Sequence, residues 1–395
     1  MIPYGRQSIN LFDVLSVSKQ LAFKSLTQGS KIEEFEERVA EYVGAKYAIA
    51  VSSATAGLHL AVMALELPVD SEIITSPISF VASSNAILYS SHQPKFIDVE
   101  RETINIDLNL VAQEIESNKN VRAVIPVHFA GLPCDMEKLA RLRATRGIKI
   151  VEDAAHALGA RYPNGKKVGS CEFSDMTVFS FHPVKSITTG EGGMITTNSY
   201  ALYKKLLRLR SHGINKLNDS YESSLLSTTD GISNPWFYEM QELGFNYRLT
   251  EIQAALGASQ LDRLDKFINK RRSRVDWYLL KLPEVHAVTP AQSNSSTLSA
   301  HHIFPIRVNY SELKISRARL MKSLKERGIG TQVHYIPIPL HPYYQKLGFG
   351  VENLPEAMSY YHEALTIPLY PSLKQSQQRK VIVELSNLIT ASQEK

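Results

Sequence analysis

The chain has 395 residues, of which 44% are hydrophobic and 21% charged, and its formal net charge is +5. This length exceeds one ordinary core and predicts two lobes, and the composition is typical of a soluble globular protein. No run of five like charges and no stretch of about 18 apolar residues occurs, so neither a nucleic-acid partner nor a membrane span is expected.

The chain contains two cysteines, Cys134 and Cys171. They form neither a disulfide framework nor a metal-ligand spacing, which favours a reducing compartment. The N-terminal residues, MIPYGRQSINLFDVL, lack a basic region followed by an apolar core, so no signal peptide is expected. We therefore expect a cytoplasmic protein.

The first half of the chain is expected to form an arm followed by an alternating α/β domain. Residues 1–29 suggest the arm, with one short helix, and residues 31–44 have apolar side chains at helical spacing and end at Gly44. From residue 47 to residue 197, short apolar runs alternate with helical stretches. This pattern predicts a mainly parallel sheet between two layers of helices, which binds ligands at the carboxyl ends of its strands.

The second half is expected to lead into a smaller α+β domain. Residues 214–240 are polar and aperiodic, which is typical of a functional or disordered loop. One or two long helices are predicted over residues 250–282, and later strands are predicted at 301–308 and 329–335. A helix between those two strands and a terminal helix complete the prediction.

These patterns divide the chain into three parts. We predict an N-terminal arm over residues 1–29, a large domain over 30–255 and a small domain over 256–395.

Lys185 stands in the stretch FSFHPVKSITTGEGG among aromatic, small and hydroxylated residues. Such a lysine is either a surface residue beside a turn or a functional amine.

The stretch VSSATAGLH places Ser53, Thr55 and Ala56 where a strand enters a helix. Free N–H groups at a helix N-terminus attract phosphate, although a plain Ser/Thr cap has the same pattern.

Two further stretches add an acid and a hydroxyl. IVEDAAHALGA puts Glu152 and Asp153 at the end of a hydrophobic strand, as a helix cap or a ligand partner, and Ser180 ends another strand. Pyridoxal phosphate requires a lysine, an acid against its pyridine nitrogen and a phosphate cup, so the stretches together favour this cofactor. The lysine must be partly neutral, so its site must lower its pKa. Phe80 would stack on the cofactor or pack in the core.

Four stretches together resemble a known family: SSATAGLHLA, EDAAHALGA, FSFHPVKSITTGEGG and GFNYRLTEIQAALG. In their order and spacing they are similar to the sugar aminotransferases of the DegT/DnrJ/EryC/StrS family, and the resemblance covers nearly the whole chain. It implies a fold-type I pyridoxal-phosphate-dependent transferase.

The resemblance also implies roles for individual residues. Lys185 would form the Schiff base and shuttle protons, Asp153 would pair with the pyridine nitrogen, and His156 would lie near the phenolic oxygen. The phosphate would be held by Thr55, Ala56 and Ser180. Asn246 would reach the phosphate of a neighbouring subunit, so that the active site would exist only in a homodimer. Without the resemblance, Asn246 would be a loop-capping residue.

Within this family, IPYGRQSI, LTQG, TSPISFVAS and VHYIPIPLHPYY are most similar to the aminotransferases of pseudaminic acid synthesis. That resemblance implies transfer of an amino group from glutamate to C4 of a UDP-linked 4-keto-6-deoxy-N-acetyl-hexosamine. The implied substrate-side residues are Tyr4, Gln28, His334 and Tyr335. His334 and His341 lack a third ligand, so no metal site is expected.

Other functions remain open on the sequence. SSATAGLH and EDAAHA fit equally well an aminotransferase that makes UDP-4-amino-4-deoxy-L-arabinose. Dehydratases of this family carry histidine at the position of Lys185, and a regulatory relative would need a DNA-binding extension for which the first 30 residues leave no room. A non-catalytic cofactor-binding protein would tolerate Lys185→Ala. His182 would assist proton transfer or pack beside the strand, and packing is the expectation.

Overall fold

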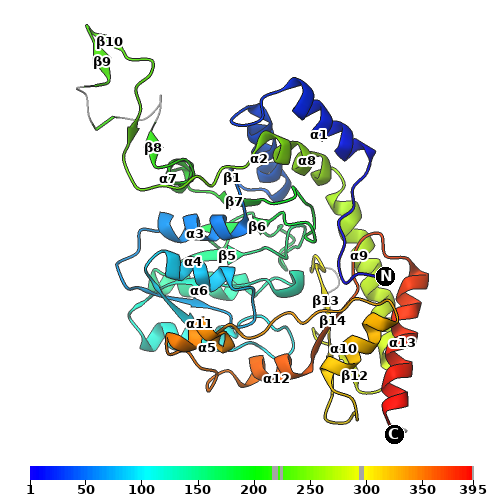
Figure 1. Cartoon of the computed structure of the whole chain (residues 1–395). Coiled ribbons are helices and arrows are strands. Elements are labelled where there is room, and N and C mark those ends of the chain that lie inside the picture. The colour runs from blue at the N-terminus through cyan, green and yellow to red at the C-terminus, as the bar shows by residue number, and fades with distance from the viewer. Residues whose placement is uncertain (216–220, 223–225, 293–297, 394–395) are drawn as a thin grey trace.

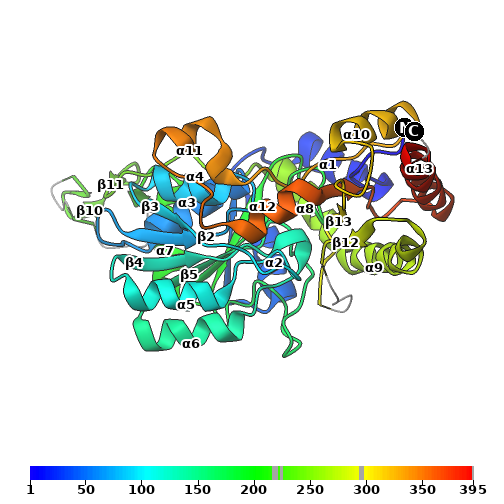
Figure 2. The ribbon, with the colours of Figure 1, turned by 90° about the horizontal axis from the view of Figure 1, so that it is seen from below.

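The computed structural model describes residues 1–215, 221–222, 226–292 and 298–393. Its centre is a seven-stranded sheet in the order β1-β7-β6-β5-β4-β2-β3. Figure 1 labels β1, β7, β6 and β5, and Figure 2 labels the remaining strands. The strands are β1 (Tyr47–Val51), β2 (Glu72–Thr75), β3 (Gln93–Phe96), β4 (Val121–Ile125), β5 (Lys149–Asp153), β6 (Met176–Ser180) and β7 (Gly193–Thr197). Only β7 runs antiparallel to its neighbours, which confirms the predicted mainly parallel sheet.

Helices cover both faces of this sheet (Figure 2). One face carries α3 (Ala54–Ala64), α4 (Ala82–Tyr89) and α7 (Tyr200–Arg210), and the other carries α2 (Ser30–Val43), α5 (Leu108–Ser117) and α6 (Met136–Arg146). Alternate residues of a strand point to opposite faces. In β1, Ala48 and Ala50 accordingly pack in one hydrophobic cluster and Ile49 and Val51 in the other.

The N-terminal arm packs on helix α8 (Glu251–Leu261), which follows residues 214–240 in the chain. The arm's helix α1 (Leu11–Phe23) lies against α8, and α8 also packs on α2. Asp13 and Gln20 are the buried residues of α1, whereas most of its apolar side chains are exposed. The predicted boundaries between arm, large domain and small domain stay a prediction.

A smaller lobe is built on a three-stranded antiparallel sheet with its own hydrophobic cluster. Its strands are β12 (Val288–Pro290), β13 (Phe304–Val308) and β14 (Ala364–Ile367), and its main helices are α9 (Leu264–Lys281), α10 (Arg317–Glu326) and α13 (Gln375–Gln393). Two short helices, α11 (Pro342–Lys346) and α12 (Pro355–Glu363), lie between α10 and β14 in the chain. The strand expected within residues 301–308 is confirmed as β13.

The strand predicted over residues 329–335 is wrong. This segment forms only isolated bridges, from Ile329 to Ile2 and from Gln332 to Thr366. Its backbone is shared between two different neighbours, so it has no continuous ladder. The segment instead runs along the cavity described below.

Within residues 214–240, the described part projects away from the body of the molecule (Figure 1). In the described part, β8 (Ile214–Asn215) pairs with β11 (Glu239–Met240), and β9 (Thr228–Thr229) pairs with β10 (Ile232–Ser233). The predicted loop therefore contains short paired strands. In the described parts of the chain, no helix is both long and apolar enough to span a bilayer.

Candidate active site

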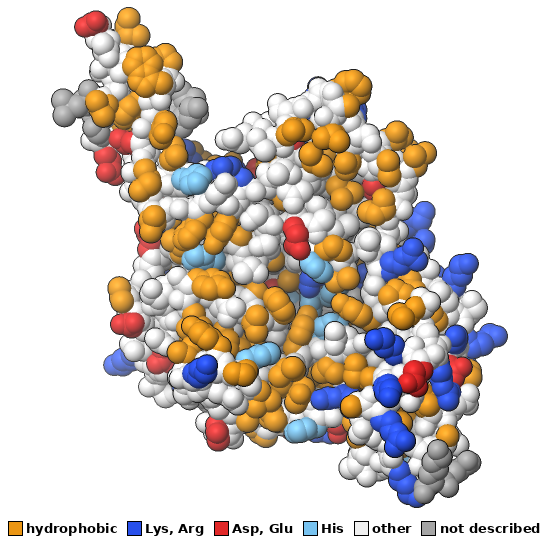
Figure 3. Space-filling view, in the orientation of Figure 1, with side chains coloured by type: hydrophobic (Ala, Val, Ile, Leu, Met, Phe, Trp, Pro, Cys, Tyr) orange, Lys and Arg blue, Asp and Glu red, His pale blue; other side chains and the backbone are white. Residues whose placement is uncertain are grey.

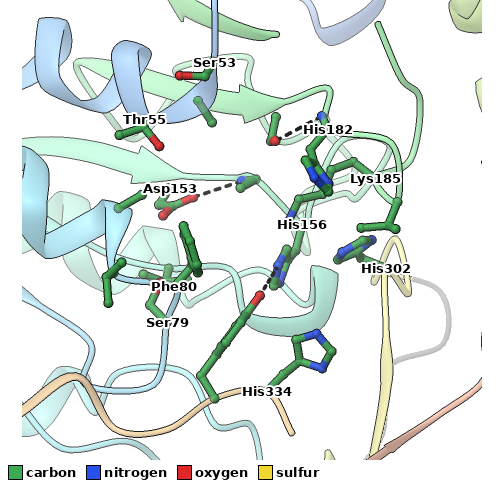
Figure 4. Close-up of a pocket in the computed structure, with 18 of the residues that line it drawn as sticks. Ser53, Thr55, Ser79, Phe80, Asp153, His156, His182, Lys185, His302 and His334 are labelled. Atoms are coloured by element: carbon green, nitrogen blue, oxygen red, sulfur yellow. Dashed lines mark hydrogen bonds between the residues drawn. The ribbon is translucent and has the colours of Figure 1, made fainter. Parts of the chain in front are cut away.

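A cavity of about 810 Å³ lies at the carboxyl ends of β5 and β6. The predicted residues that line it are Tyr4, Thr55, Phe80, Asp153, His156, Ser180, Lys185, His334 and Tyr335. Figure 3 shows histidine side chains gathered in a hollow near the centre of this face, and Figure 4 shows how the labelled side chains converge. The ends of β5 and β6 and the segment 329–335 thus bring together residues from distant parts of the chain.

The N-terminus of α3 forms one end of the cavity. Ser53 caps the helix, and its Oγ accepts a hydrogen bond from the N–H of Ala56 at 3.1 Å. Other N–H groups of a first helical turn lack partners within the helix. Strand β7 passes close to this turn, because a Cβ on Gly193 would lie 2.7 Å from the nitrogen of Ala54. The glycine therefore allows the sheet and the helix N-terminus to meet at the cavity.

Lys185 lies in the turn that follows β6. Its N–H donates to the carbonyl of His182 at 2.9 Å, and its side chain is partly buried in the cavity wall. Burial lowers the pKa of Lys185 from 10.5 to about 8, against the opposing charge of Asp153. A substantial fraction of the amine is therefore neutral near pH 8, as the predicted nucleophile requires.

Asp153 ends β5 and lines the cavity. Its Oδ2 accepts a hydrogen bond from Ser83 at 2.6 Å, and its Oδ1 accepts one from the N–H of Ala155 at 3.0 Å. The carboxylate is 5% exposed. These two bonds hold the acid in one orientation.

Glu152 is on the opposite face of the same strand and does not line the cavity. It is buried among His128, Tyr162, Ser174 and Thr177, which all contact its carboxylate. Burial raises its pKa, but the hydrogen bond and charge of His128 and the hydroxyl donors outweigh that effect and lower it. Of the two adjacent carboxylates, Glu152 is therefore a structural anion and Asp153 faces the cavity.

Three buried imidazoles line the cavity on the side away from the α3 N-terminus (Figure 4). The rings of His156 and His302 are 4.4 Å apart between centroids, and His334 is 2.9 Å from the hydroxyl of Thr366 through its Nδ1. Burial, followed by the charge of Lys185, lowers the pKa of all three, and for His334 the value falls to about 3. All three are therefore neutral at physiological pH.

Three predicted residues do not line this cavity. Ala56 is buried in α3, and Gln28 and Asn246 are exposed. Gln28 has a positive φ of 53° between α1 and α2, and the predicted role of each of the three stays a prediction. His182 is exposed in the cavity wall, so the expectation that it packs beside the strand is wrong.

The structure adds residues that sequence reasoning missed. Ser83 orients Asp153, and His302 and Glu191 line the cavity. His302 precedes β13, and only the three-dimensional packing of the small lobe brings it to His156. Glu191 lies in the same stretch as Lys185, FSFHPVKSITTGEGG, so its closeness in sequence to Lys185 could have indicated that it lines the cavity. In the described part of the chain, no group of three potential ligands is placed to hold a metal ion.

Comparison with known proteins decides the family. Residues 8–386 match the DegT/DnrJ/EryC1/StrS aminotransferase family. The chain belongs to this family. It is therefore a sugar aminotransferase that uses pyridoxal phosphate.

Members of the family with similar sequences have different names. The chain is 34% identical to the spore coat polysaccharide biosynthesis protein SpsC of Bacillus subtilis, over 98% of this chain and 97% of that protein. It is 35% identical to the UDP-4-amino-4,6-dideoxy-N-acetyl-beta-L-altrosamine transaminase of Campylobacter jejuni serotype O:23/36, over 94% and 93%.

Solved structures of the family share the whole fold. Helicobacter pylori PseC, an aminotransferase involved in the biosynthesis of pseudoaminic acid, aligns with a TM-score of 0.89 at 32% identity, over 99% of each chain. The PLP form of the putative sugar aminotransferase Spr1654 from Streptococcus pneumoniae aligns with a TM-score of 0.86 at 28% identity, also over 99% of each chain. The predicted fold class is confirmed.

The residues of the cavity fit the family's cofactor. Lys185 supplies a partly neutral amine, Asp153 a fixed carboxylate, and the α3 N-terminus with Ser180 a place for a phosphate. Phe80 is 59% exposed in the cavity wall, so its ring face is open to a planar ligand. The alternative in which Phe80 packs in the core is therefore wrong.

Proposed function

We propose that this family member transfers the amino group of glutamate to C4 of a UDP-linked 4-keto-6-deoxy-N-acetyl-hexosamine, as in pseudaminic acid synthesis. The observation that carries the proposal is the convergence of Lys185, Asp153 and the α3 N-terminus on one cavity of about 810 Å³. This volume is within the range of small-molecule sites. The resemblance to the Campylobacter and Helicobacter enzymes favours this sugar over others.

The residues of the chain divide the work in this proposal. Bound pyridoxal phosphate supplies a carbonyl for amines and a ring that accepts electrons when a C–H bond breaks. Lys185 Nζ removes the proton from the α-carbon of the donor and later delivers a proton to C4 of the sugar. Asp153 keeps a proton on the pyridine nitrogen, and Tyr4 and His334 contact the sugar side.

We propose that the active enzyme is a homodimer. Asn246 is exposed and is outside the cavity of its own chain, which suits a residue that serves a neighbouring subunit. Exposed apolar side chains gather on α1 and on the projecting segment. They include Leu11, Phe12, Leu15, Phe23, Ile232, Trp236 and Met240. Large exposed apolar patches mark interaction surfaces.

Both cysteines are buried and free, which supports our proposal of a cytoplasmic location.

The substrate is tested by supplying two keto sugars to the protein loaded with cofactor and glutamate. Without a keto sugar, glutamate yields at most one equivalent of 2-oxoglutarate per subunit. We expect continued formation beyond that equivalent with the UDP-linked 4-keto-6-deoxy-N-acetyl-hexosamine and not with UDP-4-keto-L-arabinose. Turnover of the arabinose derivative alone would replace the proposed substrate. Light scattering of the same sample measures the mass, and a monomer that turns over at full rate would overturn the dimer.

A further inference from the structure

A single hydrogen bond joins Tyr335 and His156 in the cavity wall. The hydroxyl oxygen of Tyr335 is 3.1 Å from Nε2 of His156, and Figure 4 draws this bond. His156 is 6% exposed. Its other nitrogen, Nδ1, is buried and has no hydrogen-bond partner among the described residues.

The buried Nδ1 determines where the proton of His156 is. The imidazole is neutral, because burial and the charge of Lys185 lower its pKa far below its usual value. A neutral imidazole carries one N–H. On Nδ1, that N–H would be buried without an acceptor, which is the costlier arrangement. On Nε2, it donates to the hydroxyl oxygen of Tyr335.

This assignment leaves the hydroxyl hydrogen of Tyr335 unused. Burial and the carboxylate of Asp153 raise the pKa of the phenol, so Tyr335 keeps its hydrogen. The described residues offer the hydroxyl no partner besides His156. The ring lies beside Phe80, with 6.4 Å between centroids, and beside His334, with 4.8 Å. Tyr335 itself lines the cavity, so its hydroxyl belongs to the wall that a bound molecule would meet.

We propose that Tyr335, held by the Nε2–H of His156, donates its hydroxyl hydrogen to an anionic oxygen of the molecule in the cavity. His156 is then a positioning residue, and Tyr335 is the group that touches the ligand. The inference rests on the proposed function for the identity of that oxygen. The two sources are the phenolic oxygen of the cofactor and a carboxylate of the amino donor.

The proton position is tested on the full-length protein without cofactor. Nitrogen NMR of histidine-labelled protein is compared with the H156Q variant, whose missing signal identifies His156 among the 12 histidines. We expect a protonated Nε2 and an unprotonated Nδ1. A protonated Nδ1 would overturn the proposal. This readout needs neither cofactor nor sugar, so it can fail while the proposed function holds.

The donated bond is tested by Tyr335→Phe in the cofactor-loaded protein. If the acceptor is the cofactor, the midpoint pH of its absorbance change rises by about one unit. If the acceptor is the donor, the midpoint stays and KM for glutamate rises about tenfold. Tyr4→Phe removes another hydroxyl from the cavity wall and should leave the midpoint unchanged. A Tyr335→Phe variant that changes neither quantity would overturn the proposal.

The positioning role of His156 is tested by two substitutions. His156→Ala removes the N–H and should change the same quantity as Tyr335→Phe, in the same direction but by less. His156→Gln keeps a side-chain N–H donor, so its midpoint pH should stay within about half a unit of the wild type and its KM for glutamate within about threefold. An alanine variant that behaves like the wild type would show that His156 does not position Tyr335. This pair keeps the test open if Tyr335→Phe fails to fold.

Discussion

The two sides of the cavity are held in different ways. On the side of the large sheet, backbone N–H groups close in sequence hold several polar groups, as when Asp153 accepts from Ala155 and Ser53 accepts from Ala56. The bond from Ser83 to Asp153 is the longer-range addition on this side. On the side of the small lobe, the bond between Tyr335 and His156 spans 179 residues. The first side thus depends on short motifs, and the second depends on how the lobes pack together. Substitutions on the two sides should therefore fail in different ways.

Lys185→Ala should have the largest effect, because it removes the only amine proposed to bind the cofactor and move the proton. We expect activity to fall by about 10⁴-fold. Reduction with borohydride should trap cofactor on the wild type and not on the variant. Lys167→Ala is the matched control, since Lys167 lies over the ring of Tyr42 and does not line the cavity. Full activity of Lys185→Ala would contradict the assignment.

The two adjacent carboxylates give the next largest difference. Asp153→Asn should lower kcat by about 10³-fold, because a fixed charge at the reacting group is lost. Glu152→Gln should lose far less activity but about 3 kcal/mol of unfolding free energy, since it weakens the buried hydrogen bonds that His128, Tyr162, Ser174 and Thr177 make to the carboxylate. Steady-state kinetics and urea unfolding of both variants measure this contrast. Equal losses of activity would mean that the strand does not separate their roles.

The pKa of Lys185 predicts a pH dependence on the sheet side. The neutral fraction of the amine grows as pH rises toward about 8, so cofactor attachment should accelerate about tenfold per pH unit below 8 and level off above it. Between pH 8 and 10.5 the unfolded chain binds more protons than the folded chain. Stability of the cofactor-free protein should therefore rise with pH in that window. Stopped-flow absorbance and thermal unfolding measure both effects, and Lys185→Met should abolish the second.

Thr366→Val should have the smallest effect and tests the small-lobe side. The substitution removes the hydroxyl that is 2.9 Å from Nδ1 of His334. We expect KM for the keto sugar to rise about fivefold with kcat within twofold, because one hydrogen bond positions a binding residue. Thr366→Ser keeps the hydroxyl and should restore the wild-type KM. A change in kcat alone would place His334 in the chemical step.

The sequence by itself determined the sheet side of this protein. Alternating apolar runs predicted the parallel sheet, and the contiguous motifs around Thr55, Asp153 and Lys185 predicted side chains near strand ends, where all three line the cavity. These predictions succeed because strand periodicity and strand-to-helix turns are local properties.

Only the tertiary structure decided the rest. It turned Glu152 away from the cavity that Asp153 faces, left residues 329–335 without a continuous ladder, and brought His302 to His156. The physical reason is that burial, proton position and ring contacts depend on which distant segments pack together. No short stretch of sequence specifies that packing. The proposed hydrogen-bond donor role of the Tyr335 hydroxyl therefore emerges only from the assembled fold.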